Sequence, residues 1–163
     1  MTPPGTDPAG LAAALHGDVA AWTGLPWGVR DEELSAVLGA GSPARSGRLS
    51  GQPVQWRDYP AAVRAFFDES GVAFLIWVNG LGDPARVNPV PAPLPAPEAE
   101  LVGEGDRLSG TMQLVWASRG LTGYVTEGER SLVGVALYAP TTVDYYRTWL
   151  GAKEPSPYRP WRA

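Results

Sequence analysis

The residues that could carry acid–base or nucleophilic chemistry are few and scattered along the chain. His16 is the only histidine and Lys153 the only lysine, and a histidine base needs a second side chain to orient it. The chain contains no cysteine, which excludes disulfides, thiolate catalysis and cysteine-ligated metal sites. Neither a G-x-S-x-G elbow nor a G-x-x-x-x-G-K-S/T phosphate loop occurs. We therefore predict no catalytic residue, no cofactor and no metal ligand, and we favour a protein that is not an enzyme.

Acidic residues are the remaining candidates for chemistry. The densest group, Asp31–Glu33, has the composition of a helix start, with Asp31 as the cap and two further acids where the helix dipole favours them. The sequence does not place the other carboxylates near one another: Asp58, Asp68, Glu69 and Asp144. Carboxylates beside an apolar, Trp-lined pocket could still run acid–base chemistry. A small enzyme or carrier therefore stays open as an alternative.

Aromatic residues are the one excess in the composition, with 7 Trp and 6 Tyr. Such side chains concentrate at protein interfaces because they bury a large area at a low entropy cost. Trp27 stands in the loop sequence GLPWG, and Tyr59 stands between an aspartate and a proline. With Trp116 and Tyr124 in the second half, they are the predicted partner-binding residues. For Trp116, which lies in an apolar strand, a place in the core is the alternative.

Charge and composition narrow the choice of partner. The formal net charge of −4 disfavours nucleic acid, which needs a positive surface, and leaves room for a basic protein partner. No apolar run is long enough to span a membrane, and the N-terminal sequence lacks the features of a signal peptide. We expect a cytoplasmic protein without a membrane partner. The bias towards Arg, Ala, Gly and Pro is typical of a GC-rich bacterial genome.

The elements that must position these residues follow from apolar periodicity and turn signals. Helices are predicted over 7–22, 31–38 and 142–150, and the segment 42–51 is predicted to be a loop. The predicted strands are 54–59, 62–67, 72–78, 111–117, 120–126 and 131–138, with a turn over 68–71. The fold class is therefore α+β, with antiparallel β-meander sheets, short helices and two structurally similar halves.

Domain boundaries follow from a proline-rich stretch at 80–97, which is typical of a semi-rigid connector. It separates a first unit, 1–79, made of a helical N-terminus and an α+β module, from a second β-meander module with a C-terminal helix, 98–151. Residues 152–163 form a tail. A tail or strap that docks into a larger assembly would make the chain an accessory subunit.

The tetrapeptide RLSG occurs twice, at 48–51 and at 107–110. Each copy is followed by a Trp, an apolar strand, an acidic turn and a second strand that is apolar on both faces. This order of parts indicates a structural repeat. Two unrelated antiparallel meanders would look similar and remain the alternative.

The first half also resembles a known kind of module. A glycine, an acidic helix start, a leucine-rich helix, a second glycine and a nearby proline stand in order: Gly28, Asp31, Glu33, Leu34, Leu38, Gly39 and Pro43. This pattern is similar to the α+β modules of the outer-membrane lipoprotein family SmpA/OmlA and of the β-lactamase inhibitory protein. The resemblance implies a tandem α+β fold used for protein binding, and it assigns no binding residue here. Together with the charge and the aromatic excess, it favours an interaction module of the immunity or inhibitor type.

Overall fold

The computed structural model describes residues 28–49, 51–60, 62–79, 95–102, 111–126 and 132–150. The helix predicted over 7–22, the predicted binding residue Trp27, most of the connector and the tail 152–163 lie outside these residues. The two-module division of the chain therefore stays a prediction.

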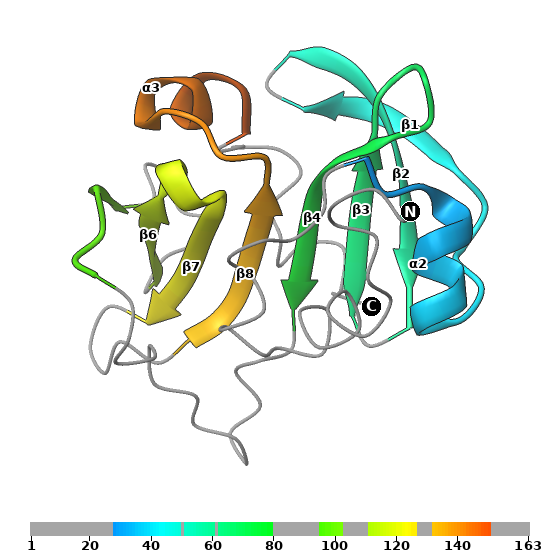
Figure 1. Cartoon of the computed structure of the whole chain (residues 1–163), viewed down its shortest axis with the longest axis horizontal. Helices are drawn as coiled ribbons and strands as arrows, with labels where there is room; N and C mark the ends of the chain where they lie inside the picture. The colour runs from blue at the N-terminus through cyan, green and yellow to red at the C-terminus, as the bar shows by residue number, and fades with distance from the viewer. Residues whose placement is uncertain are drawn as a thin grey trace, which may run out of the picture.

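Eight antiparallel strands form one sheet, in the order β1-β2-β3-β4-β8-β7-β6-β5 (Figure 1). The strands are β1 (Arg45–Leu49), β2 (Gln52–Tyr59), β3 (Val63–Phe67), β4 (Ala73–Asn79), β5 (Ala99–Val102), β6 (Thr111–Trp116), β7 (Leu121–Thr126) and β8 (Leu132–Tyr138). Each half of the sheet is a meander of four consecutive strands, and the last strands of the two meanders pair, with Trp77 opposite Ala136. The prediction of an antiparallel, sheet-rich fold with short helices is confirmed.

All six predicted strands are present, and each boundary lies within two residues of the prediction. The loop predicted over 42–51 is wrong, because Arg45–Leu49 forms the edge strand β1 and pairs with β2. This strand consists mostly of polar residues and a glycine, so it lacks the apolar alternation from which strands are predicted. The glycine is required: a β-carbon at Gly47 would lie 2.5 Å from the indole of Trp56, which packs across it.

The helix α2 (Asp31–Leu38) has the predicted bounds and packs beside β2 through the buried Leu34 (Figure 1). The N-cap is Arg30, not Asp31 as predicted. Asp31 instead accepts hydrogen bonds from the hydroxyls of Tyr59, at 2.6 Å, and Ser35, at 3.2 Å, and so ties the helix to the sheet. Gly39, with φ of +102°, ends the helix as predicted.

The turn between β3 and β4 also follows the prediction. The carboxylate of Asp68 accepts hydrogen bonds from the backbone N–H groups of Ser70, at 2.9 Å, and Val72, at 3.0 Å. Gly71 takes a φ of +81°, a conformation that favours glycine. The Ser70 hydroxyl also donates a hydrogen bond to this carboxylate, at 2.7 Å, and that bond, ahead of the other contributions, lowers the pKa of Asp68.

The C-terminal helix begins as α3 (Val143–Tyr145) and continues with π-helical geometry as η4 (Tyr146–Leu150). The N-cap is Thr142, whose side chain accepts a hydrogen bond from the backbone N–H of Tyr145. This helix packs on the sheet face opposite to α2: Tyr146 and Leu150 join a cluster separate from the one that holds Leu34. None of the described helices is long and apolar enough to cross a membrane.

Candidate docking groove

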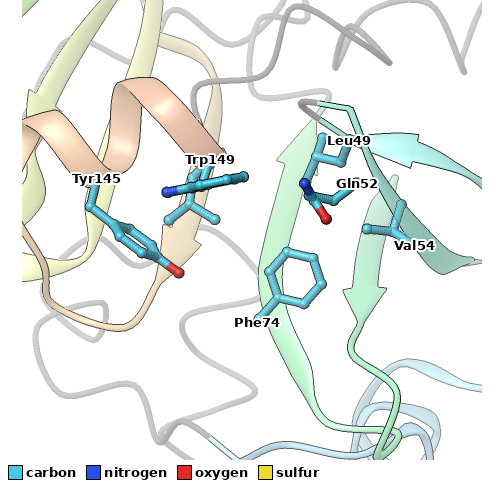
Figure 2. A pocket seen from close by; sticks show the side chains of 7 residues that line it. Leu49, Gln52, Val54, Phe74, Tyr145 and Trp149 are labelled. Atoms are coloured by element: carbon cyan, nitrogen blue, oxygen red, sulfur yellow. The ribbon is translucent and has the colours of Figure 1, made fainter.

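A shallow apolar groove lies where the C-terminal helix faces the β1–β2 hairpin (Figure 2). Its volume is about 150 Å³. The hairpin, the start of β4 and the helix supply its lining: Leu49, Gln52, Val54, Phe74, Tyr145, Trp149 and Leu150. In Figure 2 the rings of Tyr145 and Trp149 form one wall and Phe74 lies on the other. The groove therefore joins the first meander to a helix that belongs to the second.

Two aromatic rings of the helix wall are open to solvent. Tyr145 is 50% exposed and Trp149 is 41% exposed, and among the described residues they are the exposed large apolar side chains. They stand four positions apart, which places them on the same side of one helical turn. The helix predicted over 142–150 contains both residues, but neither is among the predicted partner-binding residues.

The orientation of these rings depends on a buried anchor, Tyr146. Its hydroxyl donates a hydrogen bond to the side-chain oxygen of Gln113, at 2.5 Å, and its ring stacks on Tyr138 with centroids 5.0 Å apart. The Tyr138 hydroxyl lies 2.8 Å from the Thr122 hydroxyl in the same buried layer. Burial, ahead of every other contribution, raises the pKa of Tyr146 to about 12. A helix held in this way presents Tyr145 and Trp149 in a fixed position.

The hairpin wall is held by an ion pair and an indole. Arg64, which is buried, donates to both carboxylate oxygens of Asp58, at 2.5 and 2.8 Å. Its guanidinium lies 5.3 Å from the centre of the Trp56 ring, and that ring covers Gly47 of β1. The groove residue Leu49 ends β1 and is buried. Both walls of the groove are therefore fixed before any partner binds.

The lining residues offer few polar groups. The polar atoms among them belong to the Gln52 amide, the Tyr145 hydroxyl and the Trp149 indole, and no carboxylate lines the groove. No group of three potential metal ligands occurs in the part of the chain that the structure describes. Small-molecule sites usually measure about 300–1,000 Å³, whereas a cavity of about 150 Å³ holds a molecule the size of benzene. The groove has room for a group the size of one side chain.

The predicted partner-binding residues lie elsewhere. Tyr59, Trp116 and Tyr124 are 5%, 3% and 1% exposed. Tyr59 donates its hydrogen bond to Asp31, and burial followed by this bond raises its pKa. The indole of Trp116 donates to the backbone oxygen of Pro95 at 2.8 Å and so fastens the end of the connector to β6. Their role in partner binding stays a prediction, and the groove brings together none of them.

No family model, no curated protein and no solved structure matches the chain. The resemblance to lipoprotein and inhibitor modules therefore stays a prediction as well, and the function has to be argued from the groove.

Proposed function

We propose that the chain is a cytoplasmic bacterial protein-binding module, of the immunity or inhibitor type, that holds its partner at the docking groove. The observation that carries this proposal is the exposure of Tyr145 and Trp149 beside an apolar depression. Tyr and Trp are enriched among the residues that contribute most to binding, and such residues gather around pockets that exclude water. Exposed aromatic rings at a groove are typical of an interaction site.

The fixed position of the helix supports the same conclusion. Tyr146 and Leu150 hold its inner side against the sheet, and the hydrogen bond to Gln113 sets its rotation. A surface that is already ordered loses little conformational entropy when a partner binds. The groove therefore needs no rearrangement before docking.

We also infer that the two meanders are structurally similar halves, as in a tandem module. The pairing register shifts between Phe66 and Phe67 in β3·β4, and between Tyr124 and Val125 in β7·β8, so each central strand pair carries its irregularity at the corresponding place. In both halves the shift lies next to the strand that joins the meanders.

The spacing between β4 and β8 agrees with this inference, because Leu75 pairs with Phe66 and Gly134 pairs with Tyr124 next to the two register shifts. Leu75 lies opposite Tyr138, and Asn79 lies opposite Gly134. Gly134 follows Leu75 by 59 positions (75 to 134), and Tyr138 follows Asn79 by the same 59 positions (79 to 138). Exchanging the halves by this spacing maps the ladder onto itself, as a local two-fold axis between Trp77 and Ala136 requires.

Site-specific photocrosslinking tests the proposed function. A benzoylphenylalanine at Gln52, in the groove, should crosslink one dominant protein in a lysate of the source bacterium. The same group at Arg119, an exposed residue of the turn after β6, is the matched control. Equal crosslinking from both positions, or none from Gln52, would contradict binding at the groove.

A further inference from the structure

We propose that the partner presents an extended, acidic segment that adds to β1 as a ninth strand and places one apolar side chain in the groove. This inference rests on the proposed function, and it names the kind of partner surface that the groove accepts. Three features of the β1 edge carry it: unpaired backbone, charge and the position of the groove.

The backbone of β1 is available for pairing on one side. β1 stands at the end of the strand order and pairs with β2 alone in the described sheet. Leu49 pairs with Gln52 at the end of the ladder, and two residues of sequence separate them. The alternation of antiparallel pairing then directs the main-chain groups of Ser46 and Arg48 away from β2. An extended peptide can satisfy these groups by strand addition.

The charge of this edge is opposite to that of the whole chain. Arg45 and Arg48 are exposed, and neither forms an ion pair within the described residues. A second copy that paired its own β1 here would bring like charges together, which disfavours edge-to-edge pairing. An acidic segment gains from the same charges. The expectation of a basic partner, which rests on net charge, does not extend to the segment that meets this edge.

The groove fixes the pattern that such a segment must carry. Leu49 is both the last residue of β1 and a lining residue of the groove. Side chains alternate along a strand, so Arg45 lies on the groove face and Arg48 on the other. The expected segment has one aromatic or aliphatic residue for the groove, an acid next to it for Arg48, and an acid four positions away for Arg45.

The probe is a displayed library of random ten-residue peptides, selected against the full chain at low salt. We expect enriched peptides with the pattern above. The affinity of a purified enriched peptide for the double variant Arg45→Glu/Arg48→Glu should be at least about tenfold lower than for the unmodified chain. Its affinity for Arg119→Glu should be unchanged. N-methylation of alternate amides in the peptide should weaken binding about as strongly, and hydrogen exchange at Ser46 and Arg48 should slow in the complex.

Several outcomes would overturn the proposal. The first is a selection that yields no binding peptide. The others are enriched peptides whose affinity stays the same after the charge reversal or after N-methylation. Self-association of the chain that Arg45→Glu/Arg48→Glu abolishes would show that a second copy is the occupant instead. If the peptides fail while Gln52 still crosslinks a partner, strand addition is wrong and the proposed function stands. If both fail, the groove is not an interaction site.

Discussion

The two meanders bury the same face of the sheet in different ways. The first half packs large aromatic rings around the ion pair between Arg64 and Asp58. The ring centroids of Trp56 and Phe66 lie 6.1 Å apart, and those of Phe66 and Trp77 lie 4.7 Å apart. The second half uses tyrosines in a hydroxyl network beneath the C-terminal helix.

The two halves differ in whether their buried polar atoms have hydrogen-bond partners. Within the described residues, the indole N–H groups of Trp56 and Trp77 are buried without an acceptor. In the second half the hydroxyls of Tyr138 and Tyr146 each have a partner. Buried polar groups without partners cost free energy, whereas a satisfied network specifies one arrangement. The second half therefore acts as the anchor for the helix, and the groove opens where that helix meets the first half.

The largest expected effect contrasts two adjacent tyrosines. Tyr146→Ala removes a buried ring and should lower the free energy of unfolding by about 3–5 kcal/mol. Tyr145→Ala removes a half-exposed ring and should change it by less than about 1 kcal/mol. Urea unfolding of the two variants checks the prediction. Similar losses in both would mean that the helix is not anchored through Tyr146.

The ion pair of the first half should give the next effect. Asp58→Ala leaves the Arg64 guanidinium, which is 4% exposed in its side chain, without this carboxylate and should cost about 2–4 kcal/mol. Arg57→Ala removes a 4.0 Å contact with Asp31 and a 2.9 Å hydrogen bond to the backbone oxygen of Ser42, both between partly exposed groups, and should cost about 1 kcal/mol. Thermal unfolding of both variants measures the difference. A cost for Asp58→Ala no larger than that for Arg57→Ala would argue against the pair as a support of the hairpin.

A third effect tests the close packing at the edge strand. Gly47→Ala forces a methyl group against the Trp56 ring and should cost about 1–3 kcal/mol. Ser46→Ala, one residue earlier on the exposed side of β1, is the control and should be close to neutral. Trp fluorescence recorded during urea unfolding reports both stability and the indole environment. An unchanged stability for Gly47→Ala would place Trp56 away from β1.

The smallest expected effect concerns alkaline pH. The pKa of Tyr146 is raised to about 12 in the folded state, above the ordinary value of 10.0. The folded state therefore holds this proton more tightly, so its contribution to stability is complete below pH 10 and is lost as the pH rises towards 12. Melting temperatures between pH 7 and 11 should fall less in Tyr146→Phe than in the unmodified chain. Parallel curves would show that Tyr146 does not contribute.

Much of the sheet could be predicted from the sequence, because six strands carry continuous or alternating apolar residues. The two strands at the sheet edges could not. Arg45–Leu49 is mostly exposed, and Ala99–Val102 spans only four residues. Their pairing with a neighbouring strand, rather than their own pattern, holds them in the sheet.

The proposed similarity of the two halves does not follow from the RLSG repeat alone. The copies of RLSG are 59 positions apart (48 to 107). Trp56 pairs with Phe66 and Gln113 pairs with Tyr124, the residues next to the two register shifts. Trp56 and Gln113 are 57 positions apart (56 to 113). Under the proposed correspondence of the meanders, the spacing of the tetrapeptides therefore differs by two positions from the spacing of β2 and β6. The proposal of similar halves rests on the register shifts in β3·β4 and β7·β8, and pairing irregularities leave no clear signal in a single sequence.

The groove could be predicted only in part. The helix predicted over 142–150 follows from the sequence, and the structure has it over Val143–Leu150. The outward position of Tyr145 and Trp149 depends on the rotation of that helix, which a hydrogen bond between Tyr146 and Gln113 sets across 33 positions of sequence. No local pattern contains such a contact.

The most direct test of the docking groove is the affinity of the crosslinked partner for variants of the helix wall. Calorimetric titration would compare Trp149→Ala with Thr148→Ala, an exposed neighbour outside the groove. We predict that Trp149→Ala weakens binding about 30-fold or more while its stability stays close to that of Thr148→Ala. Equal affinities for the two variants would contradict the account, because the partner would then bind without the exposed indole.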